Sequence, residues 1–145
     1  MAYIIMFLII ILDQIIKNII LNNFYFGQSL AVINNIFHIT YVQNTGAAFG
    51  ILKNHSLFFI IITIVIISAI IFMLHKSFKG NIYLNIYFGL ILGGAMGNLI
   101  DRIRLGYVVD YLDFRIWPVF NLADSFIVIG SIFIMFYMFF SGAEL

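Results

Sequence analysis

The chain has 145 residues, of which 64% are hydrophobic and 9% are charged, and its formal net charge is +1. Soluble domains contain roughly 45–50% apolar and about 25% charged residues, so this composition excludes an ordinary soluble domain and indicates a membrane protein. The sequence has no basic run and no cysteine. We therefore expect no nucleic-acid partner, and disulfides, thiol nucleophiles and thiolate-bound metals are excluded.

Four hydrophobic segments are long enough to cross a bilayer, which takes about 20 helical residues. The expected spans cover residues 3–21, 57–74, 82–100 and 121–140. The expected fold class is an all-α polytopic membrane protein with four transmembrane helices. These spans use nearly the whole length, so we expect one membrane-embedded domain over residues 1–145.

The connections between the spans differ in length, and the longest, residues 22–56, carries a strand signal. Residues 36–42 (Ile-Phe-His-Ile-Thr-Tyr-Val) are rich in β-branched and aromatic side chains, which predicts a strand or hairpin. Residues 44–50 are small and punctuated by glycine, which predicts a turn. Residues 101–120 form the second long connection, and residues 75–81 form a short polar one.

The unusual polar residues converge on one face of the membrane. Counting spans places the following residues on the face that carries the two long connections: Asp13, Lys17, Asn98, Asp101, Arg102, Asp110, Asn121 and Asp124. This convergence predicts a single site. Charge does not orient the chain, because lysine and arginine residues on this face outnumber Lys76 and Lys79 on the face of the termini.

Asp110 and Asp124 are the first candidates for chemistry. They are fourteen positions apart (124 − 110 = 14), so they meet only if the connection folds back over the start of the fourth span. Two adjacent carboxyls share one proton; the ionised one takes a proton from water while the other hydrogen-bonds a scissile carbonyl. Alternatively, Asp124 interacts with the helix N-terminus and Asp110 is a solvated loop acid. Asp113 is a competitor that faces the same way as Asp110 if the connection is helical.

Two other polar groups have both a structural and a functional interpretation. Asp13 and Lys17 share a helix face at i, i+4, so they form a structural ion pair, with Lys17 extending to the interface, or they support a site. Asn98, Asp101 and Arg102 share a face at the end of the third span. They cap and anchor that helix, or they bind a substrate backbone or orient a carboxylate.

The remaining motifs favour packing over catalysis. Gly89, Gly93 and Gly97 repeat at four-residue spacing, which predicts a stripe that packs against another span. Trp117 and Pro118 are assigned to the interfacial belt and a helix entrance rather than to the site. The histidines are scattered and no His-Glu-x-x-His or Gly-x-Ser-x-Gly motif occurs, so we expect neither a metal nor an organic cofactor.

Five local patterns, together with the four-span layout, resemble the bacterial lipoprotein signal peptidases, also called signal peptidase II. They are Asp13-x-x-x-Lys17, residues 44–50 (Asn-Thr-Gly-Ala-Ala-Phe-Gly), residues 97–102 (Gly-Asn-Leu-Ile-Asp-Arg), residues 108–110 (Val-Val-Asp) and residues 120–125 (Phe-Asn-Leu-Ala-Asp-Ser). Each pattern is weak alone, but all five occur in the family's order and cover nearly the whole chain. One departure is Ile16, where the family often carries a hydroxyl.

The resemblance implies an aspartic endopeptidase in which Asp110 and Asp124 are the catalytic pair. The implied substrate is a pre-lipoprotein with a diacylglyceryl group on a cysteine, cut just before that cysteine to release the signal peptide. Positions implied to bind substrate or support the site are Asn44, Gly46, Asn98, Arg102, Asn121, Asp13, Lys17 and Asp101.

The resemblance also implies a setting for this chemistry. It predicts a small extracytoplasmic β-cradle in the first long connection and a short extracytoplasmic helix before the fourth span. It places the chain in the bacterial inner membrane with both termini cytoplasmic and the site near the extracytoplasmic face. The expected partners are the lipid-modified substrate and membrane lipid, the chain is expected to be a monomer, and globomycin blocks members of the family.

Two other classes of function stay open at this point. A small transporter or ion-pathway subunit would use the intramembrane acids as a conduction path, although here they cluster at one face. A non-catalytic scaffold would use the glycine stripe as an interface. A presenilin-type protease is disfavoured because the Gly-x-Gly-Asp motif is missing.

Overall fold

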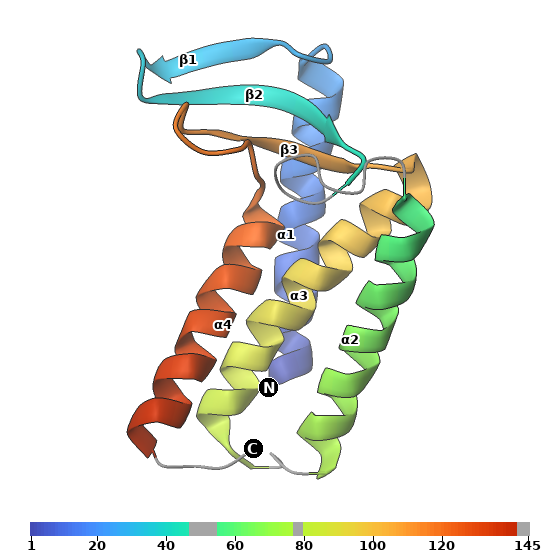
Figure 1. The fold of residues 1–145 in the computed structure, drawn as a ribbon, viewed down its shortest axis with the longest axis vertical. Coiled ribbons are helices and arrows are strands. Elements are labelled where there is room, and N and C mark those ends of the chain that lie inside the picture. Colours follow the sequence, from blue (N-terminus) through green and yellow to red (C-terminus); the bar gives the residue numbers. More distant parts are fainter. Residues whose placement is uncertain (47–54, 77–79, 142–145) are drawn as a thin grey trace.

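The computed structural model describes residues 1–46, 55–76 and 80–141. Within this part of the chain, four helices form an elongated bundle and a three-stranded sheet covers one end of it (Figure 1). The helices are α1 (Ala2–Asn23), α2 (Ser56–Lys76), α3 (Ile82–Leu105) and α4 (Leu122–Ser141), and the strands are β1 (Ser29–Ile33), β2 (Phe37–Asn44) and β3 (Val108–Asp113). The four predicted spans are confirmed, and α3 continues beyond its predicted end at residue 100.

All four helices are long and apolar enough to cross a membrane. Their outward faces carry exposed large apolar side chains, and α2 buries only Ile67, Ile70 and Leu74. Such surfaces are stable in hydrocarbon, where a helix satisfies its own backbone hydrogen bonds. The structure therefore has the arrangement expected of a bundle that is embedded in lipid.

Helix α3 is the centre of the bundle and contacts each of the other three helices. Its glycines permit close approach, as the four-residue spacing predicts. A Cβ atom at Gly93 would lie 2.7 Å from the Cβ atom of Ile9 on α1, and one at Gly94 would collide with the carbonyl oxygen of Ala123 on α4. The polar ends of α1, α3 and α4 are thereby held close together.

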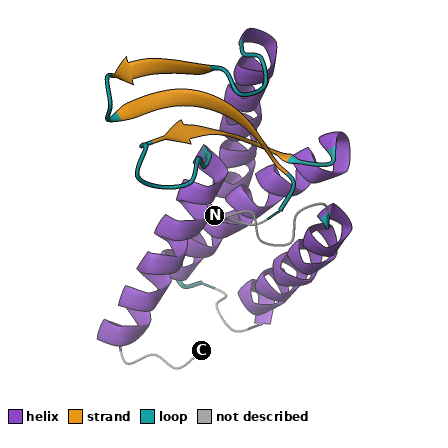
Figure 2. Ribbon diagram, turned by 45° about the horizontal axis from the view of Figure 1, so that its top comes forward, coloured by secondary structure: helices purple, strands orange, loops and turns teal. Residues whose placement is uncertain are grey.

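The three strands form an antiparallel sheet in the order β1-β2-β3 (Figure 2). This confirms the strand predicted over residues 36–42 and the small extramembrane sheet. Tyr41 on β2 and Val109 and Tyr111 on β3 are buried in a cluster with Ile20 near the end of α1. That cluster fixes the sheet on the helices. Asp110, between Val109 and Tyr111, therefore points to the opposite face of β3.

The short helix expected before α4 is not found: residues 106–121, all described, form β3, bends and an isolated bridge at Phe120. The physical reason lies in the sequence Val-Val-Asp-Tyr-Leu, whose β-branched and aromatic residues pair with β2. Gly106 ends α3 with a φ of 82°, a left-handed conformation that favours glycine, and turns the chain back. The returning segment is therefore a strand that passes over the bundle end.

Candidate active site

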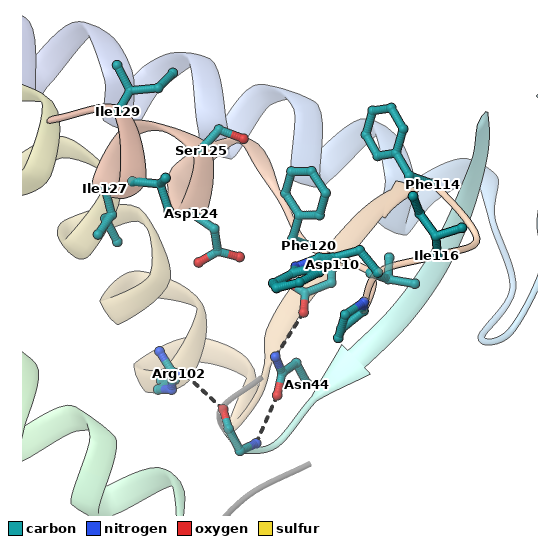
Figure 3. Close-up of a pocket in the computed structure, with 15 residues that line it drawn as sticks. Asn44, Arg102, Asp110, Phe114, Ile116, Phe120, Asp124, Ser125, Ile127 and Ile129 are labelled. Carbon is teal, nitrogen blue, oxygen red and sulfur yellow. Dashed lines mark hydrogen bonds between the residues drawn. The ribbon is translucent and has the colours of Figure 1, made fainter. Parts of the chain in front are cut away.

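Asp110 and Asp124 line one pocket, although they are far apart in the sequence (Figure 3). Asp110 enters from β3 and Asp124 from the first turn of α4. The pocket has a volume of about 850 Å³. Asp110 is 1% exposed, so the interpretation of this residue as a solvated loop acid is wrong.

Two side-chain amides hold the carboxyl group of Asp110. Asn121 Nδ2 donates to Oδ1 at 2.7 Å, and Asn44 Nδ2 donates to Oδ2 at 2.9 Å. Burial, followed by the negative charge of Asp124, raises the pKa of Asp110 to about 7, against the opposing effect of these hydrogen bonds. Asp110 is therefore suited to hold a proton near neutral pH.

Asp124 has a structural role in the helix end as well as a place in the pocket. Asn121 Oδ1 accepts a hydrogen bond from the backbone N–H of Asp124 at 2.9 Å, and Asp124 Oδ2 accepts one from the backbone N–H of Asn121 at 3.3 Å. This reciprocal cap confirms the predicted interaction with the helix N-terminus. Asp124 Oδ1 accepts a further hydrogen bond from Asn98 Nδ2 at 2.7 Å. Both carboxyl oxygens are thus held in place.

Lys17 lies at the centre of a buried ionic cluster beneath the two carboxyls. Its Nζ is 2.9 Å from Asp13 Oδ2, 2.9 Å from Asp101 Oδ2 and 2.9 Å from Asn98 Oδ1. Lys17 is 1% exposed, so the prediction that it extends to the membrane interface is wrong. The predicted Asp13–Lys17 ion pair is confirmed. Asp101 Oδ2 also accepts a hydrogen bond from the backbone N–H of Val109 at 3.0 Å, which links β3 to α3.

Sequence reasoning missed Gln14. Its Nε2 donates to Asp101 Oδ1 at 2.9 Å and to the Gly97 carbonyl oxygen at 3.2 Å. Gln14 follows Asp13 directly, so it is not part of the i, i+4 spacing that identified Lys17. A polar amide in an otherwise apolar span was the available signal.

Arg102 joins the pocket to the turn after β2. Its Nη2 donates to the Gly46 carbonyl oxygen at 3.2 Å, and the Gly46 backbone N–H donates to Asn44 Oδ1 at 3.0 Å. The guanidinium carbon lies 5.0 Å from the ring centre of Phe59, a contact that the sequence does not reveal. The rest of the predicted turn, residues 47–50, lies outside the described residues.

Apolar side chains form the other wall of the pocket. Trp117 and Pro118 belong to it, so assigning them only to the interfacial belt and the helix entrance is wrong. The remaining apolar lining residues are Phe114, Ile116, Val119, Phe120, Ile127, Val128 and Ile129. Val128 and Ile129 on α4 are exposed, so the pocket continues onto an exposed apolar surface of that helix.

Asp113 does not compete with Asp110 for the site. Residues three apart on a strand point to opposite faces, and Asp113 is not among the pocket residues. Thr40 Oγ1 donates to its Oδ2 at 2.7 Å, and Arg115 Nη1 is 3.1 Å from the same oxygen. Burial acts to raise the pKa of Asp113, but these hydrogen bonds hold it below its usual value.

Replacing Asp113 by asparagine should leave the rate of peptide cleavage within about threefold of wild type while lowering thermal stability. The amide loses one acceptor for Thr40 or Arg115, a loss worth roughly 1 kcal/mol of unfolding free energy. Parallel melting curves and turnover measurements would check this. A loss of turnover comparable to that of an Asp110 variant would return Asp113 to the catalytic site.

Among the described residues, no group of three or more histidine, cysteine, aspartate or glutamate side chains is arranged to bind a metal ion. The two carboxyls of the pocket are hydrogen-bonded by asparagine side-chain amides. The geometry presents two carboxyls beside a mixed polar and apolar pocket, which suits hydrolysis of a bond that is delivered from the membrane.

Comparisons with known proteins agree with this geometry. Residues 5–140 match the family described as Signal peptidase (SPase) II. A lipoprotein signal peptidase of Halothermothrix orenii is 51% identical over 138 residues, which covers 95% of this chain and 94% of the relative. One from Clostridioides difficile is 47% identical over 145 residues, which covers 97% and 96%, respectively.

A solved structure described as a bacterial membrane enzyme superposes with a TM-score of 0.90 at 36% identity, and it covers 99% of this chain and 92% of that one. A second structure of the same description gives a TM-score of 0.87 at 38% identity, with 94% and 91% covered. These matches indicate a multi-pass protein of a bacterial membrane. The chain belongs to the signal peptidase II family, the A8 family of aspartic peptidases.

Proposed function

We propose that this chain removes the signal peptide from pre-lipoproteins that carry a diacylglyceryl group on a cysteine, and that it cuts just before that cysteine. Membership of the family supports the reaction. The observation that carries the proposal is the meeting of Asp110 and Asp124, from β3 and α4, at one pocket that opens onto a lipid-facing surface.

In this mechanism Asp110 holds the shared proton and Asp124 is ionised. Asp124 takes a proton from water as the water oxygen bonds to the scissile carbonyl carbon, while Asp110 gives its proton to the carbonyl oxygen. The tetrahedral intermediate then collapses: the C–N bond breaks, Asp124 gives its proton to the leaving nitrogen, and the hydroxyl proton returns to Asp110. The raised pKa of Asp110, about 7, supports this assignment.

The remaining predicted site residues divide into two groups by position. Asn44, Gly46 and Arg102 line the pocket and are proposed to bind the substrate backbone. Asn98 and Asn121 contact the two catalytic carboxyls, as Asn44 also does through Asp110. The cluster of Asp13, Lys17 and Asp101 contacts Asn98 through Lys17 and is proposed to support it. The apolar wall is proposed to contact the acyl chains.

The proposed orientation places both termini in the cytoplasm and the sheet on the extracytoplasmic face of the inner membrane. In support, the N-terminus and the end of α4 lie at the end of the bundle opposite the sheet (Figure 1). A transmembrane signal peptide then enters sideways from lipid, and its cut site reaches the sheet end, where water is available. We propose that one copy, folded as a single domain, is sufficient.

The test is cleavage by the purified protein in liposomes, followed by intact-mass spectrometry. A pre-lipoprotein with the diacylglyceryl group should yield two products whose masses add up to the substrate mass plus one water, and the larger product should have the modified cysteine as its new N-terminus. The matched control is the same polypeptide without the lipid, which should be cut much more slowly. Equal cleavage of both would contradict lipid recognition, and ion flux without cleavage would favour a transporter.

A further inference from the structure

Two side-chain amides connect the proposed catalytic carboxyls in a continuous hydrogen-bond relay. Asn121 Nδ2 donates both to Asp110 Oδ1 at 2.7 Å and to Asn98 Oδ1 at 3.1 Å. Asn98 Nδ2 in turn donates to Asp124 Oδ1 at 2.7 Å. The relay works only if each amide presents its nitrogen to the correct carboxyl group.

Turning an asparagine amide by about 180° exchanges its oxygen and its NH₂ group, so a neighbouring group must fix which of the two faces each partner. For Asn121 that group is the backbone N–H of Asp124, which needs the Oδ1 atom as its acceptor at 2.9 Å. For Asn98 the oxygen Oδ1 accepts from two donors: Asn121 Nδ2 at 3.1 Å, and Lys17, whose ammonium group only donates hydrogen bonds and lies closer, at 2.9 Å. With its oxygen held by Lys17, Asn98 has only its N–H groups to offer Asp124.

Three partners hold the side chain of Lys17 in place. Its three donors are used by Asp13, Asp101 and Asn98, each at 2.9 Å, and the side chain is buried. Breaking one contact in such a buried ionic cluster is costly, because it leaves a charge unpaired. The ammonium group is therefore a rigid anchor for Asn98.

We infer that Lys17 is a positioning residue for the peptidase reaction, because it fixes the Asn98 amide so that an N–H group, and not the carbonyl oxygen, faces Asp124. The inference rests on the proposed catalytic role of Asp110 and Asp124. It assigns a function to a buried lysine that contacts neither carboxyl in the described structure. Without Lys17 the Asn98 oxygen keeps only the 3.1 Å hydrogen bond from Asn121 Nδ2, so the amide is held less firmly, and an orientation that turns its oxygen toward the ionised form of Asp124 brings repulsion.

The pH dependence of the reaction reports this effect. The acidic limb of the kcat/KM profile follows ionisation of the proposed base in the free enzyme. Repulsion from an inverted Asn98 moves that limb to higher pH. Loss of the Lys17 charge acts in the same direction, so non-additivity with an Asn98 variant separates positioning from charge. The charged and titratable groups around Asn98 and Asp124, from α1, α3 and β3, are Asp13, Lys17, Asp101, Arg102, Asp110 and Tyr111; α2 has no ionisable side chain before His75.

The experiment compares Lys17→Met with the double variant Asp13→Asn/Lys17→Met in liposomes, with a diacylglyceryl-modified pre-lipoprotein as substrate. Lys17→Met leaves two carboxylates, Asp13 and Asp101, without their cation. The double variant removes one of them and restores the formal charge of the cluster, so it keeps the test valid if Lys17→Met does not fold. We expect kcat to fall by about 10- to 100-fold, the range found for outer-shell residues that orient the ligands of a metal site. KM should stay within about twofold, because Lys17 does not contact substrate. The acidic limb of the kcat/KM profile should move to higher pH.

Two further variants separate positioning from general support of the fold. Gly130→Ala places a methyl group 2.7 Å from the Tyr87 carbonyl oxygen, in the α3–α4 contact and away from Lys17 and Asn98, so it should lower the melting temperature and leave the acidic limb in place. Asn98→Leu removes the amide itself. If Lys17 acts through Asn98, adding Lys17→Met to Asn98→Leu should cost kcat less than about threefold, because coupled residues are not additive.

The outcomes are distinguishable. An unchanged kcat and acidic limb in the folded Lys17 variants, or full multiplication of the Lys17→Met and Asn98→Leu losses, would overturn the inference while leaving the proposed peptidase reaction intact. Failure of the proposed function would appear elsewhere, as normal cleavage by variants of Asp110 and Asp124. A lower kcat, a constant KM, a shifted acidic limb and non-additivity are the expected results. Together they support the positioning role of Lys17 and the proposed peptidase reaction.

Discussion

Replacing Asp124 by asparagine should lower the rate of signal-peptide cleavage by at least about 10³-fold, because an amide cannot take the proton from water. The folded structure should survive. Asn98 Nδ2 still finds an oxygen at position 124, and only the 3.3 Å bond from the Asn121 backbone N–H loses its acceptor. The expected stability cost is about 1 kcal/mol, that of a weakened helix cap.

Asp110→Asn should be equally inactive for a different reason. The protonated carboxyl at position 110 accepts a hydrogen bond at each oxygen, from Asn121 and Asn44, and still donates its proton to the substrate. An amide at this position must turn its NH₂ group toward one of those two donors. Both the shared proton and one positioning hydrogen bond are lost.

Asp113→Asn is the matched control for both variants, because it makes the same chemical change on the same strand as Asp110 but outside the pocket. Cleavage by all three variants should be followed by mass spectrometry on protein shown to be folded by its melting curve. Normal processing by folded Asp110→Asn or Asp124→Asn would remove that residue from the mechanism.

The general plan of the molecule is readable from hydropathy and from span counting. Apolar runs identify the four helices because a bilayer imposes a minimum length on them. Because successive spans run in opposite directions, the ends of α1 and α3 and the start of α4 then lie at one face. The structure confirms that Asp13, Lys17, Asn98, Asp110 and Asp124 gather there.

The details that failed depend on tertiary contacts. The segment before α4 was expected to contain a helix, but pairing with β2 extends it as a strand. That change alone separates Asp113 from Asp110, because three positions mean the same face on a helix and opposite faces on a strand. Gln14 and Phe59 were missed because each acts on a residue far away in sequence, Asp101 and Arg102 respectively. No local spacing records such pairs.

Gly94→Ala should lower cleavage by about 100-fold or more by forcing α4 away from α3. A Cβ atom at this position would collide with the Ala123 carbonyl oxygen and approach Ile127 Cγ1 to 2.8 Å. Backbone cannot move aside as a flexible side chain does, so the helices must separate. The residue next to Ala123 is Asp124, whose 2.7 Å bond to Asn98 spans the same interface. A misplacement of about 1 Å at a catalytic group is enough to cost about 10²-fold.

Gly130→Ala is the matched control, because it adds the same methyl group to the same helix pair, six residues beyond Asp124 on α4 (130 − 124 = 6), 2.7 Å from the Tyr87 carbonyl oxygen. Each variant should lose roughly 1–3 kcal/mol of unfolding free energy through overpacking. Only Gly94→Ala moves the part of α4 that carries Asn121 and Asp124, so the two should share a melting temperature loss and differ in kcat. Equal turnover in both, at equal folded fraction, would show that the reaction tolerates displacement at this end of the α3–α4 interface.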